Sequence, residues 1–558
     1  MSGTDPHESW PRVAKTVRDC KKSGGKLIVV DPRETDSTKL ADIWLQLRPG
    51  TDTALFMSMI NVVIEEGLYD RDFVEEWCHG FDKLAERARD YPPEKAAEIT
   101  CVSADKIKKA ARLLGENKPF YSWNGMGTEQ LQNSIQAVQA RLILAAITGS
   151  IDAEGGTYLG RPGRGRALTE LMAVDQLSQE QKQKQLGADR FKFQSFPGYD
   201  LIKENTMRVW GRLPAGEQTA VASAHQPTIF RAILTGEPYP VRAVITHAHN
   251  PMVTQANTKL VYKALKNLDL HVVLDYWLTP TAELADYVLP VASWLERPDF
   301  MGDYAGEQAL PSSIPGEYDH KSDYEIFRGI GIRLGQDWPW KNLEEVFDYM
   351  IEPSGKTFKQ VVEKGNQKRP NIKYKNYEKT GFATPTGKVE LYSTILEKLG
   401  YDPLPRYEEP PESPISTPDS TKEYPLILIT GGRFKPMFHS EWRQIDSIRR
   451  MHPHPLAQIH PEMANSLGIN DGDWMWIESP RGRVRMKCRY FEGIDKGVVH
   501  CQHGWWYPEL PGEEPWLHGV WESNINVLTD DEPDNCNPIN GGWPLRTALC
   551  RVYKCKTY

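Results

Sequence analysis

The chain has 558 residues, of which 40% are hydrophobic and 25% charged, with a formal net charge of −8 at pH 7. This length allows roughly three to four domains, and no stretch reaches the ~18 uninterrupted apolar residues of a membrane span. An acidic chain does not fit a nucleic-acid-binding protein, whose binding face is normally basic. The eight cysteines include no Cys-X-X-Cys pair, so neither a zinc site nor a disulfide framework is indicated.

The first predicted domain covers residues 1–158 and has an α/β pattern. A loop at Asp5-Pro6 is followed by a polar amphipathic stretch and the apolar run GKLIVV, which ends at Asp31. Helical patterns follow at 53–66 and after Ser103, a residue suited to an N-cap. This order predicts a helix and then a buried parallel strand with an acidic residue at its carboxyl end.

A glycine-rich loop closes this first domain. The predicted strand 120–123 leads into the sequence Asn-Gly-Met-Gly at 124–127, and a long helix is expected at 133–148. Free backbone N–H groups at a helix start suit a pyrophosphate. A tight turn that requires glycine explains the same residues equally well.

Residues 159–240 are rich in Gly, Arg and Gln, which predicts an irregular connection. It serves either as a substrate funnel or as a plain surface crossing, and the sequence does not separate the two.

The second predicted domain, residues 241–401, repeats the layout of the first about 244 residues later. Asn250-Pro251 matches Asp5-Pro6, and the run LHVVL ends at Asp275 as GKLIVV ends at Asp31. The interval from Pro to this Asp is 25 residues in the first copy and 24 in the second, and a Leu-Ala-Asp motif ends 11 residues later in both. Agreement at three fixed points indicates an internal repeat.

The repeated acidic residues lie where an open α/β sheet places its ligand crevice, beyond the carboxyl ends of the strands. A carboxylate there can accept hydrogen bonds from a ribose or a guanine edge. The alternative is that Asp31 and Asp275 only cap the turns that follow them.

The two copies differ at their beginnings. The second copy has a leading strand at 241–246, whereas only four residues precede Asp5-Pro6 in the first. We therefore expect an unpaired sheet position in the first domain and an N-terminally truncated chain, or one that pairs with a separately encoded piece.

The C-terminal part begins after a proline-rich linker at 402–423. Residues 424–558 alternate short strands with Gly/Asp turns around one short helix near Pro461. This pattern predicts a β-barrel.

Several ordered motifs resemble the catalytic subunits of the dimethyl sulfoxide reductase superfamily, the molybdopterin oxidoreductases. They are DPRETDSTKLADIWLQLRPGTDTAL, TPTAELADYVLP, ATPTGKVELYS and INDGDWMWIESPRGRV, and the match covers essentially the whole chain. ADIWLQLRPGTDTALFMSMINVVIEEGLYD, EKLGYDPLP and HGWWYPE look most like the acetylene hydratase and anaerobic dehydroxylase branch. The resemblance implies two pseudo-symmetric open α/β sheet domains, each binding one guanine dinucleotide, plus a C-terminal six-stranded-type β-barrel that binds both.

The resemblance also implies cofactor-binding residues. Those for one dinucleotide and the adjoining pterin are Gly3, Thr4, Asp5, Pro6, His7, Glu8, Ser9, Asp31, Pro32, Arg33, Glu34, Thr35, Gly50, Thr51, Asp52, Met126 and Gln130. Those for the other are Asn250, Leu274, Asp275, Arg297 and Asp323. The barrel supplies Gly431, Gly432, Arg433, His439, Ser440, Gln502, His503, Asn526 and Arg546.

Three histidines, His439, His500 and His503, could suggest a metal site, but their spacing does not suit one helix or turn. Hydrogen bonding behind the cofactor is the favoured role. No metal ligand and no catalytic residue is identified. The family's [4Fe-4S] motif and metal-ligating side chain have no counterpart, and are expected only in a missing N-terminal part.

The expected cofactor is a molybdenum- or tungsten-bis(pyranopterin guanine dinucleotide). The leading hypothesis is an oxidoreductase acting on a small molecule, with an iron–sulfur electron-transfer subunit as partner. The alternatives are a non-redox, acetylene-hydratase-like lyase and an inactive cofactor-binding fragment. Residues 1–11 do not form a secretory signal, which indicates a cytoplasmic protein as the sequence stands, with the periplasm left open by the expected truncation.

Overall fold

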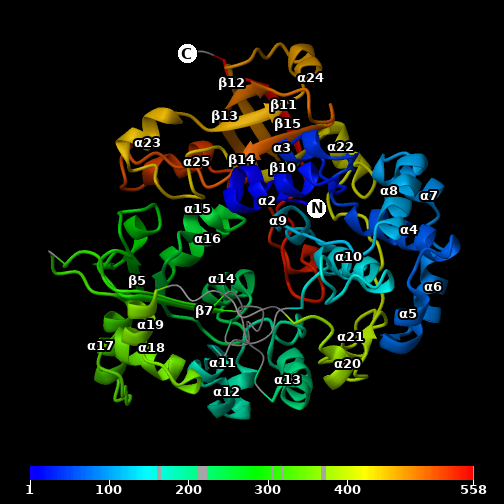
Figure 1. The fold of residues 1–558 in the computed structure, drawn as a ribbon. Helices are drawn as coiled ribbons and strands as arrows, with labels where there is room; N and C mark the ends of the chain where they lie inside the picture. Colours follow the sequence, from blue (N-terminus) through cyan, green and yellow to red (C-terminus); the bar gives the residue numbers. More distant parts are fainter. Residues whose placement is uncertain are drawn as a thin grey trace. The chain divides into compact units, whose positions relative to one another are not determined.

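The computed structural model describes residues 1–159, 165–166, 168–211, 213, 223–303, 306–316, 318–365 and 373–556. The chain forms two compact units. Unit 1 comprises residues 1–158, 251–262 and 388–558, and unit 2 comprises residues 159–250 and 263–387. Figure 1 labels many of the helices and strands of the two units.

The first part of unit 1 is an α/β layer built around a short parallel sheet. Strand β1 (Ile28–Val30) pairs with β2 (Ile43–Leu45), and Ser2 bridges Val30 on one side and Asn124 on the other. Residues 1–3 thus occupy, over a short length, the sheet position that was expected to be unpaired. The helices are α1 (Pro6–Ser9), α2 (Pro11–Lys22), α3 (Asp36–Leu40), α4 (Asp52–Glu65), α5 (Arg71–Trp77), α6 (Phe81–Ala88), α7 (Pro93–Thr100), α8 (Ala104–Glu116), α9 (Met126–Glu129) and α10 (Ser134–Ile147).

Helix α4 is the centre of this layer. Its residues from Asp52 to Val63 are all buried, and it packs against α7, α8 and α10. A helix that is buried all round needs apolar residues on every face, which explains the run ALFMSMINVVI. Ser103 caps α8 as predicted, since its side chain accepts a hydrogen bond from the Lys106 N–H.

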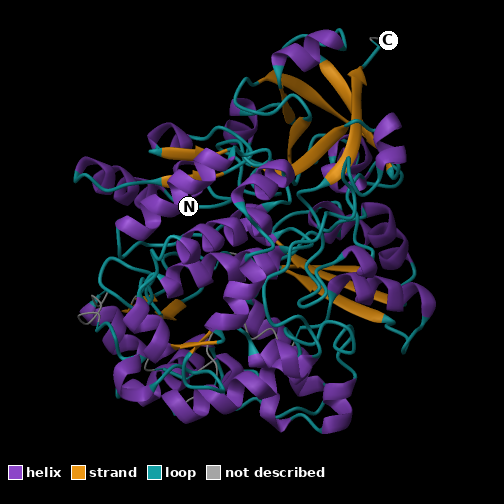
Figure 2. Cartoon of the chain, turned by 90° about the vertical axis from the view of Figure 1, so that its right-hand side faces the viewer, coloured by secondary structure: helices purple, strands orange, loops and turns teal. Residues whose placement is uncertain are grey.

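The C-terminal part of unit 1 is a closed six-stranded barrel in the order β10-β14-β11-β13-β12-β15. The predicted barrel is therefore confirmed (Figure 2). Side chains alternate between the barrel interior and its outer face, as at Met475 and Ile477 in β12, which are fully buried. The strands are β10 (Leu426–Gly432), β11 (Leu456–Ile459), β12 (Trp474–Ser479), β13 (Gly482–Tyr490), β14 (Val498–Gln502) and β15 (Ala548–Lys554).

Shorter elements complete unit 1. Strand β3 (Cys78–His79) pairs with β9 (Val389–Glu390), which precedes the linker. The remaining helices are α15 (Pro251–Thr254), α21 (Thr394–Leu399), α22 (Pro418–Glu423), α23 (Asp446–Met451), α24 (Pro461–Ser466) and α25 (Val520–Ser523), and α16 (Thr258–Lys266) begins in this unit and ends in unit 2.

Unit 2 is built on a three-stranded parallel sheet of β4 (Ala243–His247), β5 (Leu270–Asp275) and β6 (Tyr287–Pro290), with a separate hairpin of β7 (Asp299–Asp303) and β8 (Gly306–Leu310). The segment 159–240, expected to be irregular, contains helices; its polar composition hides their apolar periodicity. The unit's helices are α11 (Leu168–Leu171), α12 (Gln179–Gln183), α13 (Phe196–Trp210), α14 (Gln226–Thr235), α17 (Asp323–Arg333), α18 (Leu343–Ile351), α19 (Phe358–Lys364) and α20 (Tyr377–Thr380).

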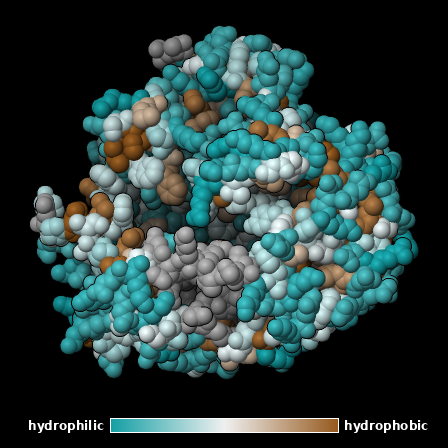
Figure 3. All heavy atoms as spheres, viewed as in Figure 1, coloured by the Kyte–Doolittle hydropathy of each residue, from teal (hydrophilic) through white to brown (hydrophobic). Residues whose placement is uncertain are grey.

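In the part of the chain that the structure describes, no helix combines the length and the apolar content of a membrane span. On the face drawn in Figure 3, hydrophobic residues form scattered patches among hydrophilic ones.

The internal repeat has the same local geometry in both units. The Asp42 carboxylate accepts the Leu27 N–H at 2.7 Å, and the Asp286 carboxylate accepts the His271 N–H at 2.7 Å. In each copy the aspartate's own N–H returns to the carbonyl of the same strand residue, at 2.8 Å. The Leu-Ala-Asp motif therefore ties the start of one strand to the start of the next.

Candidate functional site

A cradle of glycines in unit 1 brings two backbone segments together. The Gly127 N–H donates to the Gly3 carbonyl at 2.9 Å. A Cβ on Gly127 would lie 2.7 Å from the Gly3 Cα, and a Cβ on Gly3, whose φ is +57°, would lie 2.5 Å from the Thr128 nitrogen. Only glycine permits the two segments to approach so closely.

Asp5 organises the loop that leads into α1. Its carboxylate accepts the Ser37 hydroxyl at 2.8 Å and the His7 N–H at 3.2 Å. In unit 2 the equivalent Asn250 accepts the Thr281 hydroxyl at 2.6 Å. The repeat thus preserves a hydrogen bond from the first loop of each copy to the residue six positions after its strand-end aspartate.

The strand-end aspartates also match. The Asp31 carboxylate accepts the Arg33 N–H at 2.9 Å, and the Asp275 carboxylate accepts the N–H groups of Tyr276 at 2.7 Å and Trp277 at 3.3 Å. Burial raises the pKa of Asp31 to about 6 and also raises that of Asp275. Both carboxylates therefore cap the turns that follow them, and in each case the backbone N–H groups donate to the same oxygen, Oδ1.

A third buried carboxylate, Asp52, begins α4. Burial raises its pKa to about 7, against hydrogen bonds from its own N–H and from Thr128, and Asp31 adds a like charge. Gly50, with φ +86°, lets the preceding turn pass close to Pro410 and Thr547. Asp31 and Asp52 are thus poised to change charge near neutral pH.

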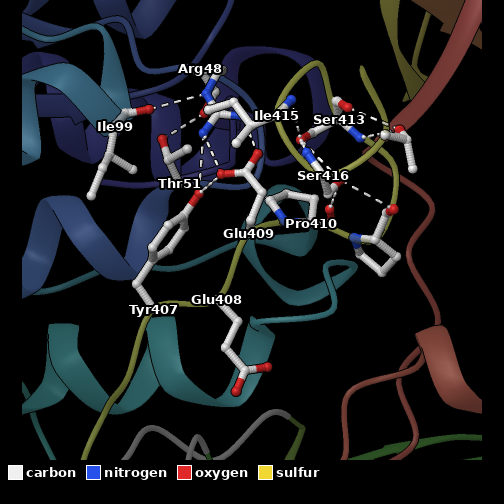
Figure 4. A network of polar contacts seen from close by, with 12 residues as sticks. Arg48, Thr51, Ile99, Tyr407, Glu408, Glu409, Pro410, Ser413, Ile415 and Ser416 are labelled. Carbon is white, nitrogen blue, oxygen red and sulfur yellow. Dashed lines mark hydrogen bonds and ion pairs between the residues drawn. The ribbon is translucent and has the colours of Figure 1, made fainter. Parts of the chain in front are cut away.

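An ion-pair network fixes this turn (Figure 4). Arg48 donates to both oxygens of Glu409, at 2.6 and 2.8 Å, and to the Ile99 carbonyl at 3.0 Å. The Tyr407 hydroxyl also donates to Glu409, at 2.5 Å. Burial opposes ionisation of Glu409, but the hydrogen bonds from Arg48, Ser413 and Tyr407 outweigh it and lower its pKa. The linker before the barrel thereby holds the turn at Gly50 to Asp52 in place.

The barrel loop from Gly431 to Ser440 contacts the start of α1. Lys435 donates to the His7 carbonyl at 2.6 Å and lies 3.8 Å from a Glu8 oxygen. Arg33 stacks over Phe491 at 5.7 Å, and the Glu34 N–H donates to the Gly493 carbonyl at 2.7 Å. Within unit 1, the barrel therefore adjoins both the segment 3–9 and the segment 31–35, which were predicted to bind the first dinucleotide.

A chain of hydrogen bonds links the loop's predicted residues. Arg433 bonds to His439, whose Nδ1 lies 2.8 Å from the His503 Nε2, and the His503 Nδ1 bonds to the Gly432 carbonyl at 3.1 Å. Burial, aided by Arg433, Arg443 and Arg546, lowers the pKa of His439 to about 4. Burial, with His439, Arg546 and Arg443 nearby, lowers that of His503 to about 3. Both rings are therefore neutral at pH 7. His439 and His503 are hydrogen-bonded to each other, whereas His500 bonds to Gln458 at 2.9 Å.

Buried guanidinium groups surround this chain. Arg546 bonds to the Thr430 carbonyl, its Nε is buried without a hydrogen-bond partner, and burial lowers its pKa to about 10. Across the ranges that the structure describes, neither Arg433 nor Arg546 forms an ion pair with a carboxylate. Arginines held in this way suit a phosphate or another planar acceptor.

Other predicted residues are engaged within the protein. The Gln502 side chain accepts from His452 at 2.8 Å, and the Asn526 amide donates to the Val253 carbonyl at 2.9 Å. Met126 is exposed at the start of α9, and the Gln130 carbonyl accepts the Leu545 N–H at 3.1 Å. The Ser440 carbonyl accepts the Trp506 indole N–H, Thr35 caps α3, and the Pro32 carbonyl accepts from Gln46.

In unit 2, several of the predicted residues lie at or near the carboxyl ends of strands β4 and β5. Leu274 is buried in β5, and Asp323 at the start of α17 lies 3.7 Å from His247, the last residue of β4. Arg297 lies 3.8 Å from Asp299. His247 pairs with Leu274 in the sheet, so Asp323 lies near the residue that precedes Asp275.

Comparison with known proteins identifies the family. Residues 1–333 match the molybdopterin oxidoreductase family, and residues 426–544 match the molybdopterin dinucleotide binding domain. The chain belongs to the molybdopterin oxidoreductase family. It is therefore a member of the dimethyl sulfoxide reductase superfamily, as its motifs predicted.

Alignments with individual relatives cover almost the whole of this chain. Acetylene hydratase from Syntrophotalea acetylenica is 38% identical, with 98% of this chain and 76% of that protein covered. Formate dehydrogenase H from Escherichia coli is 28% identical, with 90% and 68% covered. The solved structure of acetylene hydratase from Pelobacter acetylenicus matches with a TM-score of 0.93 at 37% identity, over 98% of this chain and 76% of that one. The predicted fold is confirmed.

The residues that the structure brings together in unit 1 fit an anionic dinucleotide. The close approach at Gly3 and Gly127 leaves no room for a Cβ. Among the described residues, Arg433 and Arg546 form no ion pair with a carboxylate, so both cations can interact with an anion. Sequence reasoning missed Ser37, Thr281 and Lys435, which hold the loops rather than form a motif. The six-residue interval between strand-end aspartate and hydroxyl in both copies was the signal that could have found the first two.

Proposed function

We propose that the chain holds a molybdenum or tungsten cofactor carrying two pyranopterin guanine dinucleotides, one at each copy of the repeat. The observation that supports this most strongly is the shared pair of hydrogen-bonding positions, Asp5 with Ser37 and Asn250 with Thr281, each beside a strand-end aspartate. Asp31 and Asp275 would accept hydrogen bonds from the two guanosines. The glycine cradle and the first turn of α1 would receive a pyrophosphate.

The barrel residues would bind the pterin and phosphate groups. Arg433 and Arg546 would donate to them, and the neutral His439–His503 pair would orient Arg433. When bound, the metal centre would supply redox chemistry or activate water. The residues Met126 and Gln130 would lie toward that centre.

For the reaction, oxidoreduction of a small molecule is the first candidate, with an iron–sulfur electron-transfer protein as partner. Formate dehydrogenases at 28–29% identity favour it. Hydration is the second candidate, because acetylene hydratase is more similar, at 38% identity. Both candidates use the same binding residues.

An assay on cofactor-loaded protein separates these candidates. Formate is supplied with an artificial electron acceptor, and acetylene without one. Acceptor-dependent turnover supports oxidoreduction, and acetaldehyde formation without an acceptor supports hydration. Metal-loaded protein that turns over neither substrate would favour a binding module that lacks activity of its own.

A further inference from the structure

The outer face of the barrel carries a cavity of about 450 Å³ that the proposed function does not use. Its lining residues come from α23, the first residue of β12, the middle of β13 and the segment 507–522. None of the predicted dinucleotide-binding residues lines it. Its size suits a small organic molecule.

An aromatic ring forms one wall of this cavity. Trp474 begins β12 on the outer face of the barrel, where it is half-buried, and pairs in register with Lys487. The Arg485 guanidinium lies 5.4 Å from the indole centroid and the Lys487 ammonium 5.8 Å from it, and the His454 ring meets it edge-on at 5.4 Å. A second planar ring can stack on such an indole, in a field that favours negative charge.

Two of the cavity's three arginines already have carboxylate partners. Arg449 binds Glu509 at 2.6 Å and the His452 carbonyl at 3.1 Å, and it stacks over Trp505 at 4.9 Å. Arg485 is paired with Glu522. Both carboxylates of the lining are therefore neutralised.

Arg450 is the remaining cation. It is exposed on α23, and it forms no hydrogen bond or ion pair with any residue that the structure describes. Burial, with Lys487 and Arg449 nearby, lowers the pKa of His454, so that ring is neutral at pH 7. The cavity thus combines an apolar ring wall with one uncompensated guanidinium group.

We propose that this cavity binds a small planar aromatic anion, with the ring on Trp474 and the carboxylate or phosphate on Arg450. Guanidinium groups bind both anions through two parallel N–H donors. The ligand is therefore distinct from the guanine dinucleotides in place and in size.

Isothermal titration with three probes tests the proposal. They are 2-naphthoate, 2-naphthyl phosphate and the uncharged 2-naphthol. Binding of either anion, about tenfold tighter than 2-naphthol, is expected. Tighter binding of the carboxylate or of the phosphate identifies the natural anion. Failure of both anions to bind, or equal binding of 2-naphthol, overturns the proposal.

Variants locate the site. Arg450→Gln should weaken anion binding about tenfold, whereas Arg89→Gln, which changes an exposed arginine after α6, should not. Trp474→Leu should abolish binding and Trp474→Phe should retain part of it, with the melting temperature measured for each. Asp31→Ala should leave naphthoate binding unchanged, because Asp31 belongs to the proposed dinucleotide site and does not line this cavity. The naphthoate result therefore does not depend on whether the dinucleotide assignment is correct. Unchanged affinity in Arg450→Gln would refute the site.

Discussion

The Arg48–Glu409 ion pair should contribute several times more to the free energy of unfolding than an exposed ion pair of the same geometry. Arg48→Met removes two charge-assisted hydrogen bonds and leaves the half-buried Glu409 with Tyr407 and Ser413 as donors. The two side chains are 11% and 20% exposed. Breaking a buried pair costs ~3 to 5 kcal/mol, and partial exposure reduces this to about 2 to 4 kcal/mol.

The chain supplies a matched control. Arg112 donates to both oxygens of Glu66 at 2.8 Å, but these side chains are 47% and 35% exposed. Arg112→Met should therefore cost less than about 1 kcal/mol. Denaturant unfolding followed by far-UV circular dichroism measures both.

A double-mutant cycle isolates the interaction. Arg48→Met with Glu409→Gln should cost clearly less than the sum of the single changes, because the second change removes the uncompensated charge. Equal losses of unfolding free energy in Arg48→Met and Arg112→Met, or an additive double-mutant cycle, would refute the claim that the network in Figure 4 holds the turn at Gly50 to Asp52 in place.

Two further predictions concern the site. Because burial raises the pKa of Asp52 to about 7, the folded state favours the protonated carboxyl, and stability is lost as pH rises from about 4, the unfolded value, through 7. The melting-temperature advantage of Asp52→Asn over the parent should therefore grow between pH 5 and pH 8; a constant difference would contradict this. Gly127→Ala must displace the Gly3 backbone, which should lower the free energy of unfolding by about 1 to 3 kcal/mol. Gly316→Ala, whose Cβ would have no atom nearer than 3.8 Å, should lower it little. Equal losses of stability in thermal unfolding would contradict the close approach of Gly127 to Gly3.

The sequence predicted features that recur at fixed spacing. The repeat, its strand-end aspartates and the alternating barrel strands all depend on local periodicity, and the structure has them where they were expected. The hydrogen bonds from Asp42 and Asp286 show why the Leu-Ala-Asp motif recurs.

Contacts between distant segments could not be predicted in this way. Arg48 and Glu409 are 361 residues apart, and no local pattern connects them. Asn526 has the residue type expected for a pterin contact, yet its amide binds the Val253 carbonyl. Burial and the backbone around a side chain, rather than its type, decide which groups remain available to a ligand.

Binding of GDP tests the central claim most directly, because GDP contains the guanosine and pyrophosphate groups of the proposed cofactor. Titration calorimetry should show two GDP molecules per chain and weaker binding of ADP. Asp31→Ala and Asp275→Ala should each weaken binding at one of the two sites about 10- to 150-fold, since losing one charge-assisted hydrogen bond costs ~1.5 to 3 kcal/mol. No binding of GDP, equal affinity for ADP, or two intact sites in both variants would contradict the account.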